Sequence, residues 1–573
     1  MSEKQFLTID GREVELDKGL NVLEHARKLG IEIPNLCYAP ELSIYGACRM
    51  CLVEIVDQKT GRVSLDSSCS LLPKPGMVIR TNTQQLRMYR KGILELLITN
   101  HCQECNTCDS NQSCKLQQYA STYNIKDLPY VQHASKSDVD NSSPCIEKDT
   151  TKCVSCGLCV RMCGEVQNVG AIDFAHRGFE MCVAAVGEKP IGESNCVGCG
   201  QCALICPVGA LVPKNNIAEM WKLLADKTKK VSVQVAPSVR FGVGNAFGIS
   251  PEENTFGRLV ASLRAIGFDE VYDTNTSADM TVVQEAEELL ERLKTKHTWP
   301  MFTSCCPAWV RYVENQFPEV MPHVSTCKSP MQMYAATFHK VKEPNHVHGA
   351  IMPCTAKKLE GEREEFSKQT SFVLTTYEII RMIKEMGIDY ATIPSEEVDV
   401  KWGNSTAAAQ IFGVSGGVME AALRYALFAL NQNTPENYKA IAESGIRGLP
   451  RADAKAGALV DGIKKAKLNL GGTELTVAVV SGLSNAAELI RRIKEGEHFD
   501  FVEVMACPGG CIGGGGQPKA TWDIKKKRAE GIYRAADAMP LQSSEENPVM
   551  KEWRDLLGSK KAEHDYYHVH YKH

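Results

Sequence analysis

Cysteine dominates the chemistry that this sequence could perform. The chain of 573 residues contains 24 cysteines, 18 of them between Cys37 and Cys206 and six from Cys305 onward. Thiolates in such numbers bind metals or iron–sulfur clusters in a reducing compartment and form disulfides in an oxidising one. The first ten residues, MSEKQFLTID, show no apolar export segment. We therefore expect a cytoplasmic protein whose cysteines are metal ligands.

Two cysteine runs with the same spacing give the most specific signal. The spacing C-x2-C-x2-C-x3-C occurs from Cys153 to Cys163 and again, 43 residues later, from Cys196 to Cys206. It is typical of bacterial ferredoxins with two [4Fe–4S] clusters, in which the fourth cysteine of each run binds the other cluster. The expected ligand sets are Cys153, Cys156, Cys159 and Cys206 for one cluster, and Cys196, Cys199, Cys202 and Cys163 for the other.

An earlier group of four cysteines lies in a segment predicted to be rich in β-structure. A hairpin with a turn at Asp10 and Gly11, a helix and an LVEIV strand surround it. Four thiolates on a small β-rich scaffold suit a [2Fe–2S] cluster. Zinc is the less favoured alternative, because the spacing between the first two ligands is long for a zinc ribbon. The four ligands are Cys37, Cys48, Cys51 and Cys69.

A third group combines one histidine with three cysteines after a helix predicted at residues 85–99. Its spacing is H-x3-C-x2-C-x5-C, and either Zn²⁺ or a [4Fe–4S] cluster could use that set. Cys102, beside the histidine, could replace it as a ligand. The group consists of His101, Cys105, Cys108 and Cys114.

The rest of the chain has an α/β pattern that brings further cysteines to the ends of strands. Predicted strands at 301–304, 348–352 and 501–505 are each followed by cysteines, and ligands collect at the carboxyl ends of strands in open α/β sheets. One more [4Fe–4S] cluster is therefore expected there. Cys305 and Cys306 are adjacent, so on an extended backbone only one can easily be a ligand. The other thiol would then stay free beside the cluster.

A helix predicted at 281–293 presents a row of ionisable side chains that runs from its apolar face toward water, the geometry that a proton path needs. Glu285 lies at the edge of its apolar face, and Glu288 and Arg292 follow toward the polar side. The alternative is a ladder of solvated charges.

Three segments of this region resemble the signature segments of [FeFe]-hydrogenases, namely TSCCPAWV (303–310), MPCTAKK (352–358) and EVMACPGGCIGGGGQP (503–518). The N-terminal modules resemble those shared by these hydrogenases and the large iron–sulfur subunit of respiratory complex I. The resemblance implies reversible H₂ oxidation and proton reduction at an H-cluster. This cofactor joins a [4Fe–4S] cubane to a two-iron subsite with CO, cyanide and a bridging dithiolate amine. Its cubane ligands would be Cys306, Cys354, Cys507 and Cys511, the last bridging to the subsite.

The resemblance also implies roles for individual side chains. Lys357 would hydrogen-bond one cyanide and Ser238 the other, and His101 would be preferred over Cys102. Met331 occupies a place that is Gln in some members. The remaining expected pocket residues are Pro237, Pro330, Met352, Phe412 and Met505. The implied proton path consists of Cys305, Glu285, Ser325, Glu288 and Arg292.

The predicted fold class is multidomain α+β. We expect a β-rich [2Fe–2S] ferredoxin domain at 1–82, a [4Fe–4S] domain with one histidine and three cysteine ligands at 83–131 and a two-[4Fe–4S] ferredoxin-like domain at 132–215. A large two-lobed α/β catalytic domain follows at 216–540, and a small-subunit-like tail at 541–573. The expected inventory is one [2Fe–2S] cluster, three accessory [4Fe–4S] clusters and one H-cluster.

Charge and hydropathy exclude other classes. Lys and Arg number 65 against 69 Asp and Glu, which argues against nucleic-acid binding. No uncharged apolar run approaches the roughly 18 residues of a membrane span. We expect the hydrogenase subunit of an NAD(H)-linked complex, of a kind that can also couple to ferredoxin by electron bifurcation. Its expected partners are a flavin subunit, a small iron–sulfur subunit, ferredoxin and maturases. The alternatives are a stand-alone ferredoxin-dependent hydrogenase, a non-catalytic relative of eukaryotic iron–sulfur assembly and an H₂ sensor.

Several features are assigned no cofactor. Cys145, Cys182 and Cys327 are interpreted as buried thiols, Cys327 near the cofactor. The run GVGNAFG (242–248) is interpreted as a loop, because it does not match the dinucleotide-binding pattern. Glycines 513–516 are expected to allow close backbone approach to the cluster. The histidine-rich tail, HDYYHVHYKH, is not expected to bind a metal.

Overall fold

The computed structural model describes residues 4–131, 139–295, 299–366, 368–399, 404–453, 458–470 and 472–571. The chain forms two compact units. The first contains residues 1–194, 205–212 and 451–460, and the second contains residues 195–204, 213–450 and 461–573. The domain boundary expected at residue 132 lies outside the described residues. Among the described helices, none has both the length and the apolar character needed to cross a bilayer.

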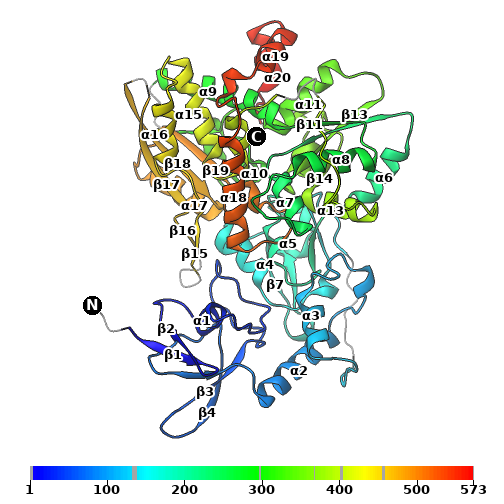
Figure 1. Ribbon diagram of the computed structural model, residues 1–573, viewed down its shortest axis with the longest axis vertical. Coiled ribbons are helices and arrows are strands. Elements are labelled where there is room, and N and C mark those ends of the chain that lie inside the picture. Colours follow the sequence, from blue (N-terminus) through cyan, green and yellow to red (C-terminus); the bar gives the residue numbers. More distant parts are fainter. Residues whose placement is uncertain are drawn as a thin grey trace. The chain divides into compact units, whose positions relative to one another are not determined.

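The first unit begins with a five-stranded sheet in the order β2-β1-β5-β3-β4 (Figure 1). Strands β1 and β2 form the expected hairpin, with Asp10 and Gly11 at positive φ in its turn. Helix α1 packs Val22, Leu23 and Ala26 against this sheet. Its strands and helices are β1 (Phe6–Ile9), β2 (Arg12–Glu15), α1 (Val22–Lys28), β3 (Leu52–Val56), β4 (Val63–Ser67) and β5 (Val78–Arg80).

Short elements separated by ligand-bearing loops follow. They are α2 (Gln84–Thr99), α3 (Lys115–Thr122), β6 (Ile146–Lys148), α4 (Leu158–Arg161), β7 (Ile172–Ala175), β8 (Cys182–Ala185) and β9 (Leu211–Pro213), with the hairpin β15 (Arg451–Asp453) and β16 (Ala458–Val460). Helix α5 (Gln201–Ile205) belongs to the second unit except for its last residue. Cys145 is buried as expected, whereas Cys182 is only half-buried in β8.

The second unit contains two four-stranded sheets, green and orange in Figure 1. The first, in the order β11-β10-β13-β14, is entirely parallel. The second has the order β12-β19-β18-β17, in which only β17 runs antiparallel to its neighbour. The strands are β10 (Lys230–Val235), β11 (Glu270–Asp273), β12 (Met301–Phe302), β13 (His346–Met352), β14 (Val373–Thr375), β17 (Ile463–Leu470), β18 (Thr473–Ser481) and β19 (Phe501–Met505).

Helices cover both sheets and enclose two separate apolar cores. Buried side chains of α8 and α13 pack on the first sheet, and those of α9 and α15 pack on the second. The helices are α6 (Ile217–Ala225), α7 (Val239–Ala246), α8 (Phe256–Ile266), α9 (Asn275–Lys294), α10 (Pro307–Gln316), α11 (Pro330–Val341), α12 (Ala356–Glu362), α13 (Thr376–Glu385), α14 (Ala407–Gln410), α15 (Gly417–Ala429), α16 (Pro435–Glu443), α17 (Leu483–Lys494), α18 (Trp522–Asp537), α19 (Val549–Leu557) and α20 (Lys560–Tyr567).

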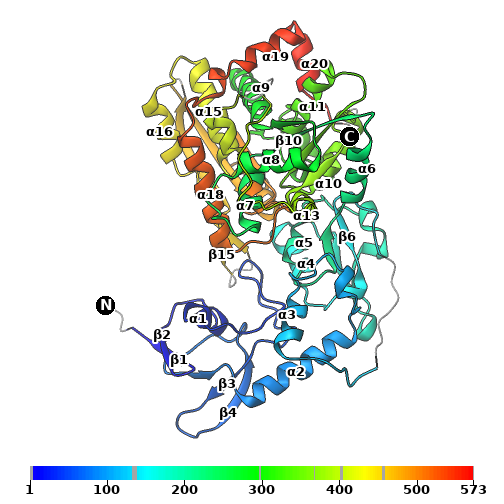
Figure 2. The ribbon, with the colours of Figure 1, turned by 45° about the vertical axis from the view of Figure 1, so that its right-hand side comes forward.

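The C-terminal helices α19 and α20 form the red hairpin beside α9 and α11 (Figure 2). Trp553 and Tyr567 of this hairpin are fully buried in a core with Tyr334 and Phe338 of α11. The tail is therefore an integral part of the second unit.

The run GVGNAFG was wrongly predicted to be a loop, because most of it belongs to helix α7. Its glycines permit close helix packing. A Cβ atom on Gly242 would stand 1.9 Å from Oε1 of Gln517, and one on Gly244 would stand 2.7 Å from the side chain of Thr255. These glycines therefore occupy helix positions at which any larger side chain would collide with a neighbouring residue.

Candidate active site

A buried cavity of about 80 Å³ lies where the two sheets of the second unit approach each other. Cys306 follows β12 and Cys507 follows β19, both in the second sheet, whereas Cys354 follows β13 of the first. The thiols therefore converge from the carboxyl ends of strands in two different sheets. All four expected cubane ligands line this cavity, namely Cys306, Cys354, Cys507 and Cys511.

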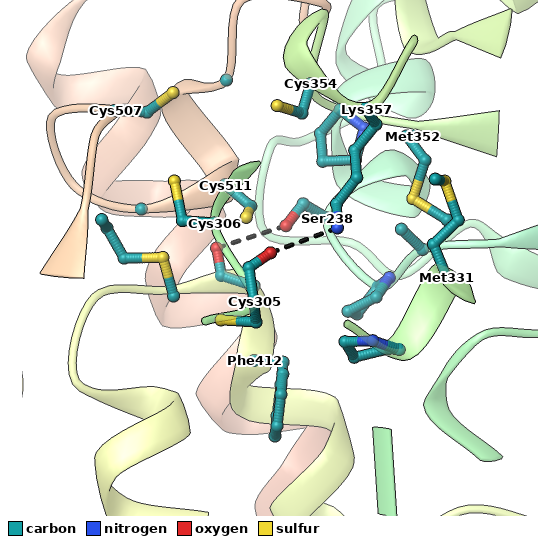
Figure 3. A pocket seen from close by; sticks show the side chains of 18 of the residues that line it. Ser238, Cys305, Cys306, Met331, Met352, Cys354, Lys357, Phe412, Cys507 and Cys511 are labelled. Atoms are coloured by element: carbon teal, nitrogen blue, oxygen red, sulfur yellow. Dashed lines mark hydrogen bonds between the residues drawn. The ribbon is translucent and has the colours of Figure 1, made fainter. Parts of the chain in front are cut away.

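The other residues expected around the cofactor line the same cavity (Figure 3). They are Pro237, Ser238, Cys305, Pro330, Met331, Met352, Lys357, Phe412 and Met505. In Figure 3 the sulfurs of Cys305 and Cys306 point in different directions from adjacent positions on the chain. The backbone of Cys306 is extended, with φ −95° and ψ 103°, so adjacent side chains diverge as expected.

The donor atoms fit an iron–sulfur cofactor. Burial raises the pKa of Cys354 to about 12 and the pKa of Cys507 well above its usual value. Such thiols stay protonated unless a metal replaces the proton, and soft thiolates are the ligands that iron–sulfur clusters use. The glycines after Cys511 allow the backbone to approach closely. A Cβ atom on Gly514 would stand 2.1 Å from the carbonyl oxygen of Pro353, and one on Gly515 would stand 2.3 Å from that of Cys199.

Lys357 supplies one buried positive charge at the cavity wall. Its Nζ donates to the carbonyl oxygen of Cys305 at 3.1 Å and to Oε2 of Glu360 at 2.8 Å. Burial alone would lower the pKa of Lys357, but the ion pair with Glu360 outweighs it and raises the pKa. The lysine is therefore a fixed cation. Glu360 was missed by sequence reasoning, although it lies three residues after Lys357 on α12, a spacing that pairs side chains on a helix.

Ser238 stands where β10 passes into α7. Its hydroxyl donates to the carbonyl oxygen of Gly413 at 3.2 Å, and Nε2 of Gln517 donates to the carbonyl oxygen of Ser238 at 2.9 Å. Gly413 and Gln517 therefore fix this corner of the cavity. Neither was predicted, because both are remote in sequence and act through single contacts.

Glu285 is completely buried on α9, deeper than the edge position that its helical pattern suggested. Its carboxyl faces the backbone N–H of Ser304 and the hydroxyl of Ser325, which offset only part of the effect of burial. Burial, followed by the charge of Glu288, raises the pKa of Glu285 to about 8. Cys305 is also buried, and burial followed by the charge of Glu285 raises the pKa of its thiol. Both groups are therefore neutral at pH 7.

The outer part of the expected path is hydrogen-bonded. The hydroxyl of Ser325 donates to Oε2 of Glu288 at 2.9 Å, and Arg292 forms an ion pair with Oε1 of Glu288 at 2.5 Å. Arg292 also donates to the carbonyl oxygens of His323 and Val324. Glu288 and Arg292 line a larger cavity of about 550 Å³.

Cys327 is buried as expected, and its nearness to the cofactor stays a prediction, since its carbonyl oxygen accepts from the hydroxyl of Ser304, the residue before Cys305. It does not line the central cavity, and its thiol instead donates to Oε2 of Glu288 at 3.6 Å. The backbone of β12 explains this position, since Ser325 N donates to the carbonyl oxygen of Phe302 and directs the loop toward α9.

The ligand groups expected in the first unit also gather locally. The thiols of Cys48 and Cys69 hydrogen-bond the sulfur of Cys37 and lower its pKa, so three of the four predicted [2Fe–2S] ligands are in contact, and Cys69 contacts Cys51. His101, Cys105, Cys108 and Cys114 line one small cavity together with Cys102. Cys153, Cys156, Cys159 and Cys206 line another, as the exchange of fourth ligands predicts.

The second ferredoxin-type ligand set spans both units and stays a prediction, because Cys163 belongs to the first unit and Cys196, Cys199 and Cys202 belong to the second. The latter three lie beside the central site. Thr355 Oγ1 donates to the carbonyl oxygen of Gly198 at 2.7 Å, and Gln201 Nε2 donates to that of Gly513 at 2.9 Å. Hydrogen bonds thus join the loop of an accessory cluster directly to two loops that carry cubane ligands.

The family comparison agrees with this site. Residues 229–515 match the model of the iron-only hydrogenase large subunit, C-terminal domain. The chain belongs to the iron-only hydrogenase family. The hydrogenase also matches a 2Fe-2S binding domain at 5–84, the NADH-ubiquinone oxidoreductase-G iron-sulfur binding region at 90–129 and a 4Fe-4S dicluster domain at 152–210. Residues 522–573 match the iron hydrogenase small subunit.

Full-length relatives share the modular arrangement. The hydrogenase is 39% identical to NADP-reducing hydrogenase subunit HndD of Solidesulfovibrio fructosivorans, over 99% of this chain and 98% of that one. It is 33% identical to iron hydrogenase 1 of Clostridium pasteurianum over 99% of both chains. A solved structure of a variant of [FeFe]-hydrogenase HydA1 from Chlamydomonas reinhardtii aligns with a TM-score of 0.52 and 34% identity, covering 62% of this chain and 99% of that one. The hydrogenase is therefore an H₂ oxidoreductase that uses iron–sulfur clusters and an H-cluster.

Proposed function

We propose that the H-cluster is held by Cys306, Cys354, Cys507 and Cys511, with its two-iron subsite toward Lys357, Ser238 and Cys305. When bound, this cofactor supplies the iron centre at which protons and electrons interconvert with H₂. The observation that carries the proposal is the convergence of four thiols, one fixed ammonium and one additional thiol on a single buried cavity. Lys357 would bind and orient an anionic ligand, a charge-assisted contact that is strong away from water.

Protons would pass through this chain's own side chains. Cys305 holds a proton at its neutral thiol, and Glu285, neutral at pH 7 because burial raises its pKa, accepts and returns protons at its carboxyl. Ser325 connects this buried carboxyl to Glu288, and Arg292 orients Glu288 at the wall of the outer cavity. The apolar surroundings of α9 exclude bulk water from the inner part of the route.

Electrons would move through one [2Fe–2S] and three accessory [4Fe–4S] clusters, bound within domains at 1–82, 83–131 and 132–215. The supporting observation is that Gly198, between two expected ligands, accepts a hydrogen bond from Thr355, the residue after Cys354. With the H-cluster, this inventory gives about 20 iron atoms per chain. The experiment is iron analysis of the matured protein together with infrared spectroscopy. About 12 irons without bands of CO and cyanide would contradict the inventory.

We further propose that the chain is the hydrogenase subunit of a complex coupling H₂ to NAD(P)(H) through a flavin subunit. Support comes from its similarity over nearly the full length to a subunit of an NADP-reducing hydrogenase and from the region similar to NADH-ubiquinone oxidoreductase-G. Purification of the native chain tests this proposal. A stable complex with a flavoprotein and NAD(P)-linked H₂ activity is expected, whereas a lone chain that exchanges electrons only with ferredoxin would favour the stand-alone alternative.

A further inference from the structure

A second group of metal-binding side chains lies at the outer end of the hydrogen bonds that link Ser325 and Glu288. Glu288 on α9, Cys327 before α11 and His568 after α20 each offer one ligand atom, and the three atoms lie within 4.8 Å of one another. Sγ of Cys327 is 3.6 Å from Oε2 of Glu288 and 3.9 Å from Nδ1 of His568. This group joins the histidine-rich tail, for which the sequence predicted no metal, to the proposed proton route.

The hydrogen bonds of His568 leave the lone pair of Nδ1 directed toward this group. Nε2 of His568 is 3.1 Å from Oε1 of Gln284, while Nε2 of Gln284 donates to the carboxylate of Glu563. Since a carboxylate accepts, the amide oxygen of Gln284 must face His568, and Nε2 of His568 must carry the proton. Metal-bound histidines characteristically donate the other ring N–H to such an acceptor. Burial lowers the pKa of His568 to about 4, so its ring is neutral at pH 7.

The two oxygens of Glu288 face different partners. Oε1 is paired with Arg292, whereas Oε2 receives the hydroxyl of Ser325 at 2.9 Å and the backbone N–H of Thr326 at 3.2 Å and faces Cys327. Nδ1 of His568 accepts from the hydroxyl of Thr326 at 2.7 Å. An ion could therefore bind Oε2 while Arg292 stays on Oε1, once the Thr326 hydroxyl, which contacts both Nδ1 of His568 and Oε2 of Glu288, turns away.

The outer cavity gives a cation access to this group. Glu288 and His568 both line it, and it measures about 550 Å³. Its further charged and titratable groups are Glu287, Glu291, Arg292, Lys560, Glu563, His564 and His570. Arg554 pairs with Glu287 and Glu563, and the charge of Lys328 also acts on His568. Four carboxylates of the lining face four cations, Arg292, Lys560, Arg554 and Lys328, so access to this group rests on the size of the cavity and not on a net charge.

We propose that Oε2 of Glu288, Sγ of Cys327 and Nδ1 of His568 form a binding site for a divalent transition-metal ion of the zinc type, and that a bound ion stops proton movement through Glu288. Thiolate, imidazole and carboxylate together suit Zn²⁺, with water from the cavity as the fourth ligand. Binding replaces the thiol proton of Cys327, which leaves to solvent. The site stands on its own geometry, whereas the effect on turnover rests on the proposed proton route.

Zinc X-ray absorption of the matured holoenzyme tests the site, because the zinc edge is separate from that of iron. The protein is freed of loosely bound metal with a chelator, equilibrated with Zn²⁺ alone and passed through gel filtration. The expected result is one zinc ion with one sulfur at about 2.3 Å and nitrogen or oxygen ligands at about 2.0–2.1 Å.

Matched variants assign the ligands. Gln284→Leu, which removes the acceptor for Nε2 of His568 together with a hydrogen bond to Glu563, should weaken zinc binding about tenfold. Loss of a ligand in His568→Ala or Cys327→Ser should weaken it by more than about tenfold. The control, His570→Ala, changes a histidine that lines the same cavity and should leave zinc affinity unchanged. A zinc shell without sulfur, or equal affinity in His568→Ala, would overturn the site.

Measurements of H₂ evolution distinguish an error in the proposed zinc site from an error in the proposed proton route. Zn²⁺ should inhibit H₂ evolution by the wild type and by His570→Ala at concentrations that fill the site, and His568→Ala should need more than about tenfold more zinc. If zinc fills the site with the expected ligands and H₂ evolution continues at its full rate, the site stands and proton movement through Glu288 is wrong. If zinc does not bind there, the site is wrong and the route is unaffected.

Discussion

Lys357 and Glu360 form a buried ion pair, with Nζ of the lysine 2.8 Å from Oε2 of the glutamate. The two residues lie one turn apart on α12, and their side chains are 11% and 3% exposed. The hydroxyl of Ser329 donates to the same glutamate oxygen at 3.1 Å. Glu360 therefore stabilises the charge of Lys357 at the cavity wall while remaining outside the residues that line it.

This pairing predicts that stability and cofactor binding can be separated. Lys357→Met leaves the Glu360 carboxylate buried without its partner, which should lower the free energy of unfolding by about 3 kcal/mol and abolish H₂ turnover. The double variant Lys357→Met with Glu360→Met should recover most of the stability, because no buried charge remains, but no activity. Thermal unfolding and H₂ evolution measure the two effects. Recovery of activity in the double variant would contradict a role for Lys357 at the cofactor.

Because the thiols of Cys305 and Cys306 point in different directions, we predict that replacing Cys305 impairs turnover and that replacing Cys306 impairs cofactor binding. Cys305→Ala should retain the iron content and the infrared bands of CO and cyanide but lose about 100-fold or more in turnover, because only a proton carrier is missing. Cys306→Ala should lose iron and those bands, because a cubane ligand is missing. Iron analysis, infrared spectra and H₂ evolution of both variants provide the comparison. High activity in Cys305→Ala would refute the proton-donor role.

The pKa of Glu285 predicts an effect of pH on stability. Its pKa is about 8 in the folded chain against an ordinary 4.5. Between these values the unfolded chain loses the proton that the folded chain keeps, so this residue lowers stability as pH rises, by up to about 1.4 kcal/mol per pH unit. Below pH 4.5 the carboxyl is protonated in both states, and above pH 8 the penalty stays constant.

Glu285→Gln should therefore gain stability relative to the wild type between pH 5 and 8 while losing turnover by about 100-fold or more, because an amide carries no exchangeable acid proton. Thermal midpoints of both proteins across this pH range measure the difference. A stability difference that does not change with pH would mean that the carboxyl of Glu285 has an ordinary pKa.

His101 and Cys102 line the same cavity, and we predict that His101 is the one that binds the cluster. His101→Ala should remove the electron paramagnetic resonance signal of one [4Fe–4S] cluster, since burial keeps this imidazole neutral and able to bind iron. Cys102→Ser is the matched control in the same cavity and should keep the signal. The opposite pattern would assign the cluster to the neighbouring cysteine.

The sequence predicted those features that depend on short spacing. The hairpin at Asp10 and Gly11, helix α2 and strand β19 were predicted close to their observed bounds, because turn residues and hydrophobic periodicity act locally. The ferredoxin spacing likewise predicted that Cys206 would join the first run rather than its own, and these four thiols share a cavity. The signature segments were sufficient to identify every thiol of the central cavity.

Features that depend on contacts between remote segments could not be predicted. The strands that carry the cubane ligands belong to two sheets, and periodicity does not say which strands pair. Helix α7 has a glycine at position 242 because Gln517, remote in sequence, occupies the space that a side chain would need. Cys327 and His568 meet across 241 residues, through the packing of the tail on α11.

An infrared spectrum of the matured hydrogenase, recorded before and after exposure to H₂, tests the assignment of the catalytic centre most directly. Protein absorbs little where metal-bound CO and cyanide vibrate, so the expected result is a set of such bands that shifts under H₂. The same bands should be missing from Cys511→Ala, which lacks the proposed bridging ligand. A matured protein with its full iron content but no CO or cyanide bands would contradict the proposal that this cavity holds an H-cluster.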